Sequence, residues 1–190
     1  NGMIGVYKIE TEVINGNVKF EKSGLASDRE AKESIETAFK YFRANSKNIS
    51  ASISLTNRDY MMYVQDIAGV GLTPELSLAA FVGLCSGAMN KPVQSQLAVL
   101  GSFSIGGTIN KIEELANVLQ VCFDAGAKNL SIVTAVSRLE LQRSVLAVFQ
   151  DRYVPAEARG CPFIKHSLSA HESKAHELRS VFRCSTNFCK

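Results

Sequence analysis

The chain has 190 residues, of which 46% are hydrophobic and 21% are charged, a composition that suits one compact domain and argues against global disorder. The formal net charge is +3, and residues 151–190 carry all of it, because residues 1–150 hold as many acidic as basic side chains. This neutral body argues against a dedicated nucleic-acid surface. No apolar run approaches the roughly 18–20 residues that would span a bilayer, so we expect no membrane segment.

Two β-strands are predicted at the start of the chain, over residues 3–14 and 17–23. Both runs are rich in β-prone side chains, and Asn15-Gly16-Asn17 lies between them. Asn-Gly between two such runs is typical of a tight turn that joins paired strands. The sequence therefore predicts a β-hairpin.

A long helix is predicted next, beginning at Ser27 and ending near Asn45-Ser46. Ser27 precedes Glu30 by three residues, which is the spacing of a capping box. Apolar residues then recur at helical spacing and form one face: Ala31, Ile35, Ala38, Phe39 and Phe42.

Two further strands and a buried helix follow. Residues 49–55 alternate apolar and serine residues, and residues 60–66 follow a polar turn, so both are predicted as strands. Gly69-Val70-Gly71 forms a loop, and Pro74 suits the first turn of a helix that ends at Lys91-Pro92. That helix is apolar on most sides, which indicates that it is buried.

The rest of the body alternates strand and helix. We expect a strand over residues 97–104, a turn at Gly106-Gly107, a helix over 112–122, a strand over 130–133 and a helix over 139–149. This order predicts an α+β fold, with small mixed sheets packed against about four helices in one domain over residues 1–150.

Residues 151–190 form a C-terminal extension without clear periodicity, which we expect to be loosely attached. Its histidines are five residues apart and share no helix face, so we expect no metal site. The chain has five cysteines and no Cys-x-x-Cys pair, which disfavours a disulfide framework. Cys85 and Cys122 have apolar neighbours, and we interpret them as reduced core thiols of a cytosolic protein.

Candidate chemistry in the body is sparse. The glycine-rich stretch 101–107 lacks the Lys-Ser/Thr ending that cradles nucleotide phosphates, so it is interpreted as a turn. Ser77 lies in the first turn of the buried helix, where it either packs or acts as a nucleophile. No histidine occurs in residues 1–165, which excludes a Ser-His-Asp triad there and leaves Lys111 as a possible base for a Ser/Lys dyad.

Several stretches resemble the Lon protease C-terminal proteolytic domain, in the order of that family and over about residues 3–135. They are Gly5–Glu10, Lys22–Leu25, Ala31–Ile35, Lys91–Val93, Leu97–Gly101 and Asp124–Lys128. Within the family, four stretches are more similar to the Lon-like proteins of BREX phage-defence systems: Ser23–Leu25, Leu76–Ala80, Gly87–Gln94 and Val118–Lys128. The resemblance implies the Lon-type fold.

The resemblance also implies where the catalytic dyad would lie. The nucleophile stretch of the family, Gly-Pro-Ser-Ala-Gly, falls on residues 73–77 when counted without gaps, so that Glu75 takes the nucleophile position. The base stretch, Gly-Gly-Leu-Lys-Glu-Lys, falls on residues 113–118, so that Val118 takes the base position. In this register no intact dyad is present.

Two functions follow from the resemblance. The first is an assembly and docking module of a longer ATP-dependent, Lon-related protein; the alternative is an active endopeptidase domain that uses Ser77 and Lys111.

The resemblance further implies an ATPase segment outside this chain, with ATP as its cofactor, a ring-shaped homo-oligomer, DNA as a possible partner of the longer protein, and a prokaryotic cytoplasmic location. The start at Asn1 indicates a piece of a longer protein. Within the chain we expect no cofactor, and nucleic-acid binding by residues 151–190 is a weaker third hypothesis.

Overall fold

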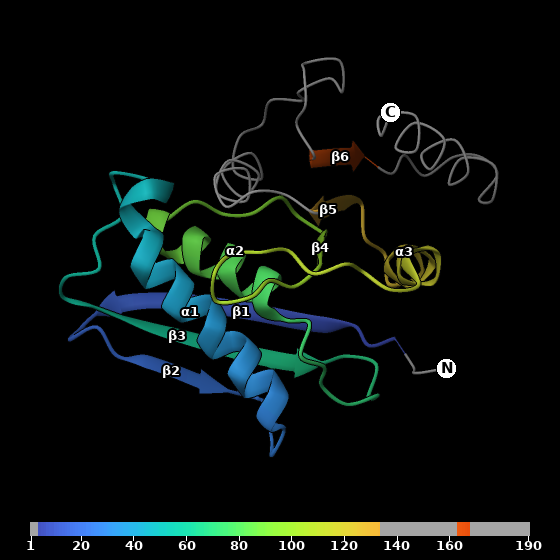
Figure 1. Ribbon diagram of the computed structural model, residues 1–190, viewed down its shortest axis with the longest axis horizontal. Helices are drawn as coiled ribbons and strands as arrows, with labels where there is room; N and C mark the ends of the chain where they lie inside the picture. The colour runs from blue at the N-terminus through green and yellow to red at the C-terminus, as the bar shows by residue number, and fades with distance from the viewer. Residues whose placement is uncertain (1–3, 134–162, 168–190) are drawn as a thin grey trace.

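The computed structural model describes residues 4–133 and 163–167. These residues form three helices and two three-stranded sheets, which confirms the α+β class (Figure 1). The first sheet has the strand order β1 (Tyr7–Asn15), β3 (Arg58–Asp66), β2 (Phe20–Ser23). The second has the order β4 (Leu97–Leu100), β5 (Asn129–Val133), β6 (Phe163–Ser167). The helices are α1 (Arg29–Ile49), α2 (Ser77–Met89) and α3 (Leu115–Asp124).

The predicted hairpin is wrong, because β3 lies between the two strands that the Asn-Gly turn joins. β1 pairs with β3 antiparallel and β2 pairs with β3 parallel. The Asp59 carboxylate of β3 accepts hydrogen bonds from the backbone N–H groups of Asn17 (2.6 Å) and Lys19 (2.8 Å). The N–H of Gly16 donates to the Asn57 carbonyl at 2.9 Å. The turn is thus bonded to the inserted strand, and it places β2 on the far side of β3.

The predicted amphipathic helix is confirmed as α1, with different ends. Asp28, and not Ser27, caps it, since the Asp28 carboxylate accepts a hydrogen bond from the Ala31 N–H at 2.8 Å. The helix continues to Ile49, which is buried and extends the apolar face by two further turns. The strand predicted over residues 49–55 is therefore wrong: its first residue belongs to the helix, and the rest forms a turn and irregular chain.

The helices α1 and α2 both pack on one face of the first sheet (Figure 1). Phe39 of α1 stacks on Phe20 of β2, with ring centroids 4.2 Å apart, and lies 5.7 Å from the ring of Tyr60 in β3. α2 approaches β1 closely, because a Cβ on Gly83 would lie 2.6 Å from the Thr11 hydroxyl. The predicted burial of α2 is confirmed, and this helix forms the centre of the core.

The segment between β4 and α3 differs from prediction in its bounds. β4 ends at Leu100, because Gly101 has a φ of 117° that an extended strand does not allow. Beyond it, Phe103 forms an isolated antiparallel bridge with Ile109 around the predicted Gly106-Gly107 turn. The predicted strand at 130–133 is confirmed as β5. The predicted helix at 139–149 and the domain boundary at residue 150 lie outside the described residues.

Candidate functional site

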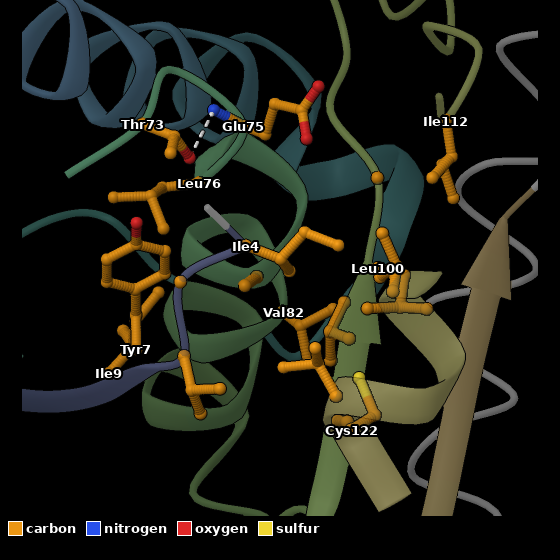
Figure 2. Close-up of a pocket in the computed structure, with 18 of the residues that line it drawn as sticks. Ile4, Tyr7, Ile9, Thr73, Glu75, Leu76, Val82, Leu100, Ile112 and Cys122 are labelled. Atoms are coloured by element: carbon orange, nitrogen blue, oxygen red, sulfur yellow. Dashed lines mark hydrogen bonds between the residues drawn. The ribbon is translucent and has the colours of Figure 1, made fainter. Parts of the chain in front are cut away.

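A cavity of about 480 Å³ lies between the two sheets. Its walls are the N-terminal part of β1 with the residues before it, the start and one face of α2, the whole of β4, and α3 (Figure 2). Most of its lining is aliphatic, with Ile4, Leu76, Val82, Leu100 and Ile112 among the contributing side chains. The site is therefore an apolar pocket that the fold builds from four separate elements.

The two positions that the family register assigns to the dyad both line this cavity. Glu75 lies on the turn before α2, where its N–H donates to the Thr73 hydroxyl at 3.4 Å. Its side chain is exposed, and in Figure 2 it extends away from Tyr7 toward the side where Ile112 lies. Val118 belongs to α3 and is half-buried. The fold thus places on one cavity the two residues that the gap-free register assigns to the dyad, although they are 43 positions apart in the chain.

The backbone around α3 supports the same register. Glu114 has a φ of 47°, which is the left-handed region that glycine adopts without strain. In the family stretch Gly-Gly-Leu-Lys-Glu-Lys, the second glycine falls on this residue. A glutamate here keeps a glycine-type conformation in front of the helix that carries Val118. The backbone at this position thus has the conformation that the glycine of the family stretch would adopt without strain.

Ser77 and Lys111 are not brought together. Ser77 is only 2% exposed, and its Oγ accepts a hydrogen bond from the Phe103 N–H at 2.9 Å and donates to the Phe103 carbonyl at 3.4 Å. Lys111 is exposed, and no hydrogen bond or ion pair joins it to another residue in the described part of the chain. Neither residue is among those that line the cavity. Ser77 thus attaches the start of α2 to the chain after β4.

Sequence reasoning missed several polar residues of the cavity: Tyr7, Thr73, Glu113 and Glu114. The Tyr7 hydroxyl donates to the Gly71 carbonyl and so holds the loop that leads to Glu75. Burial raises the pKa of Tyr7, and nearby carboxylates, including that of Glu75, raise it further. Tyr7 and Thr73 carry no sequence signal of this role, because only the fold places them beside α2.

The chemistry available in the cavity is limited. Burial raises the pKa of Cys122, which lines the cavity from α3, so this thiol is protonated at neutral pH. The described residues contain no group of three or more side chains suited to bind a metal ion. They also contain no helix that is both long and apolar enough to cross a membrane. What the arrangement offers is an apolar surface with a carboxylate-bearing rim.

Comparisons with known proteins agree with this geometry. The chain is 68% identical over 151 residues to the Lon-like protease BrxL of Bacillus cereus strain H3081.97, and 42% identical over 130 residues to the Lon-like protease BrxL of Escherichia coli O9:H4 strain HS. These alignments cover 78% and 68% of this chain, but only 22% and 19% of the relatives, so the chain spans about a fifth of their length. The likeness to the BREX subgroup is thereby confirmed. Residues 3–138 match the model of the Lon protease (S16) C-terminal proteolytic domain, and the chain belongs to that family.

Proposed function

We propose that this Lon-type domain has no working Ser/Lys dyad and serves as an assembly and docking module of a longer, ATP-dependent protein. The observation that carries the proposal is the position of Glu75 and Val118 on the wall of one cavity. A Lon-type dyad needs a hydroxyl nucleophile and a lysine whose amine takes up the hydroxyl proton. A valine side chain has no lone pair, and a carboxylate is not the hydroxyl that the lysine would activate.

The alternative dyad, Ser77 with Lys111, has less support. The Ser77 hydroxyl is buried, and both of its hydrogen bonds go to the backbone of Phe103. Lys111 is solvated, whereas a lysine that acts as a base needs burial to lower the pKa of its amine toward neutrality. To form this dyad, the start of α2 would have to detach from Phe103 and turn Ser77 toward the cavity.

The remaining parts of the proposal concern the longer protein. An ATPase segment outside this chain, a ring-shaped homo-oligomer, DNA as a partner and a prokaryotic cytoplasmic location all come from the likeness to BREX proteins. The bacterial sources of both relatives favour the prokaryotic location. In this arrangement the domain contributes a stable packed surface, and ATP-driven work is done elsewhere in the protein.

The absence of peptidase activity is tested on the longer protein with fluorescent casein, with and without ATP, and with a serine-reactive fluorophosphonate probe. We expect no casein hydrolysis above the buffer rate and no labelling of Ser77. The matched control is Ser86→Ala, which removes another hydroxyl of α2. Labelling or hydrolysis that is lost in Ser77→Ala and in Lys111→Ala, and is kept in Ser86→Ala, would contradict the proposal.

The assembly role needs a separate measurement. We expect that deleting this domain from the longer protein lowers its oligomeric state in sedimentation velocity, whereas Lys111→Ala leaves the oligomer intact. An unchanged oligomer and an unchanged set of bound partners after the deletion would refute the docking role.

A further inference from the structure

We propose that the face of the first sheet opposite α1 and α2 is a docking surface for a separate protein, whose contact surface carries arginine beside apolar side chains. This inference rests on the proposed function, because it names the chemistry of the partner that the docking module binds. Three features of the described residues carry it: a sheet face open to solvent, large apolar side chains at its centre, and carboxylates on both sides of that centre.

Alternation along the strands separates the two faces of the first sheet. Phe20 and Tyr60 pack on the ring of Phe39 in α1. Thr11 faces Gly83 of α2. Because successive side chains of a strand point to opposite faces, the residues between these contacts point away from both helices. They form what we call the open face, all nine are exposed, and none of them lines the cavity: Lys8, Glu10, Glu12 and Ile14 of β1, Met61, Tyr63 and Gln65 of β3, and Glu21 and Ser23 of β2.

The centre of the open face is apolar. Met61 and Tyr63 are on the central strand β3 and are 37% and 43% exposed, and Ile14 near the end of β1 is 44% exposed. The solvent face of a sheet usually carries polar side chains, with the apolar ones turned to the core. Methionine and tyrosine are instead enriched where two proteins meet. The open face therefore has the apolar centre of a contact surface.

Carboxylates flank this centre on both sides. In the strand register Met61 is paired with Glu12 of β1 and with Glu21 of β2. Since neighbouring strands are about 4.8 Å apart, the backbones of these two glutamates lie about 10 Å apart across Met61. Glu10 forms an ion pair with Lys8 at 2.6 Å, whereas Glu12 and Glu21 make no hydrogen bond or ion pair within the described residues. Two carboxylates of the open face are thus free to bind a cationic partner.

The charge of the open face selects the partner. Three carboxylates and one ammonium group repel phosphate groups, which disfavours nucleic acids and anionic membranes. A second copy that presented the same face would oppose like charges. Arginine complements the surface, because its planar guanidinium stacks on an aromatic ring such as that of Tyr63 and binds a carboxylate through two parallel hydrogen bonds. Lysine is a strongly hydrated point charge and gains less from the ring.

The test measures binding of fluorescein-labelled peptides to the longer protein by fluorescence anisotropy. The probe is a dodecapeptide with the repeated unit leucine-arginine-alanine, and two matched peptides have lysine or glutamine in place of arginine. We expect the arginine peptide to bind about threefold more tightly than the lysine peptide and about tenfold more tightly than the glutamine peptide.

Variants of the open face locate the bound peptide. Glu12→Gln and Glu21→Gln should each weaken binding of the arginine peptide by about twofold to fivefold, because each removes a carboxylate and keeps the shape of the side chain. Tyr63→Thr should weaken it by a similar factor, whereas Tyr63→Phe, which keeps the ring, should not. The matched control is Glu30→Gln, in the exposed first turn of α1, which should leave binding unchanged.

Three results would overturn the inference. The first is equal binding of the arginine and glutamine peptides, or no effect of Glu12→Gln and Glu21→Gln. The second is weakening by Glu75→Gln instead, which would place the peptide in the cavity. The third is a lower oligomeric state of Tyr63→Thr in sedimentation velocity, which would identify a second copy as the occupant. Failure of the proposed function is distinguishable, because casein hydrolysis contradicts that function whether or not the arginine peptide binds, and the absence of peptide binding contradicts the docking surface alone.

Discussion

Replacing Ser77 with alanine separates the structural role of this serine from a catalytic one. In the structure the Ser77 Oγ accepts a hydrogen bond from the Phe103 N–H at 2.9 Å, and both residues are buried, at 2% and 3% exposure. Alanine has no acceptor, so the variant leaves the Phe103 N–H buried without a partner. The packing of α2 is otherwise unchanged, since the substitution removes a single oxygen atom.

The size of the effect follows from the missing hydrogen bond. A buried backbone N–H without an acceptor costs about 1–3 kcal/mol, and the weaker donation from Ser77 to the Phe103 carbonyl at 3.4 Å is lost as well. We therefore expect the free energy of unfolding to fall by about 2 kcal/mol. With a urea m-value of about 2 kcal/mol per molar, the unfolding midpoint should fall by about 1 M.

Urea unfolding followed by circular dichroism measures this shift. The matched control is Ser52→Ala, which removes an exposed serine hydroxyl and should change the free energy of unfolding by less than about 0.5 kcal/mol. If Ser77→Ala unfolds at the wild-type urea concentration while a peptidase activity disappears, then Ser77 is a nucleophile and the structural reasoning is refuted.

Three further predictions concern the packing around the site. Gly107→Ala should lower stability by about 1–3 kcal/mol more than Gly126→Ala in thermal unfolding, because both have φ above 80° but only at Gly107 would the added Cβ lie 2.6 Å from the Tyr41 ring; equal losses would contradict this. Asp28→Ala should cost about 1 kcal/mol in urea unfolding and Ser27→Ala almost nothing, and the reverse order would restore Ser27 as the cap. Burial raises the pKa of Cys85, so the folded state holds this proton more tightly than the unfolded state. Stability should therefore decrease as pH rises above about 8.5, by about 1.4 kcal/mol per pH unit, and Cys85→Ala should flatten this dependence of the urea midpoint on pH.

The elements that the sequence predicts best are those whose pattern is local. The apolar face of α1 and the apolar character of α2 are both set by residue spacing, and the structure confirms both. The end of α1 was misplaced because serines at alternate positions after Ile49 are typical of a half-buried strand. The final helical turn is set instead by burial of Ile49 against the core, which no local pattern reveals.

The prediction of a hairpin in the first sheet is wrong for a non-local reason. An Asn-Gly turn predicts that the two flanking strands pair, and most of the local evidence supports this. The structure uses the same turn to hold β1 and β2 on either side of β3, through a carboxylate at Asp59 that is more than 40 residues away from the turn. Sequence spacing does not show which strand is inserted between two others. The polar lining of the cavity is non-local in the same way, because Tyr7 and Glu113 are more than 100 residues apart in the chain and line the same cavity only in the folded structure.

The positions of Glu75 and Val118 indicate how much the fold depends on the two residues that the family register assigns to the dyad. Glu75 is exposed and Val118 is half-buried, and neither belongs to the buried core cluster formed by α1, α2 and the first sheet. Changing either residue therefore costs the fold little, whereas a changed core residue would cost several kcal/mol. Glu114, in contrast, has a left-handed backbone with a φ of 47°, in which a glutamate is strained. Selection for folding alone would maintain the cavity and its backbone and would not maintain the dyad, so the family resemblance of this chain is evidence for the shape of the site and not for hydrolysis.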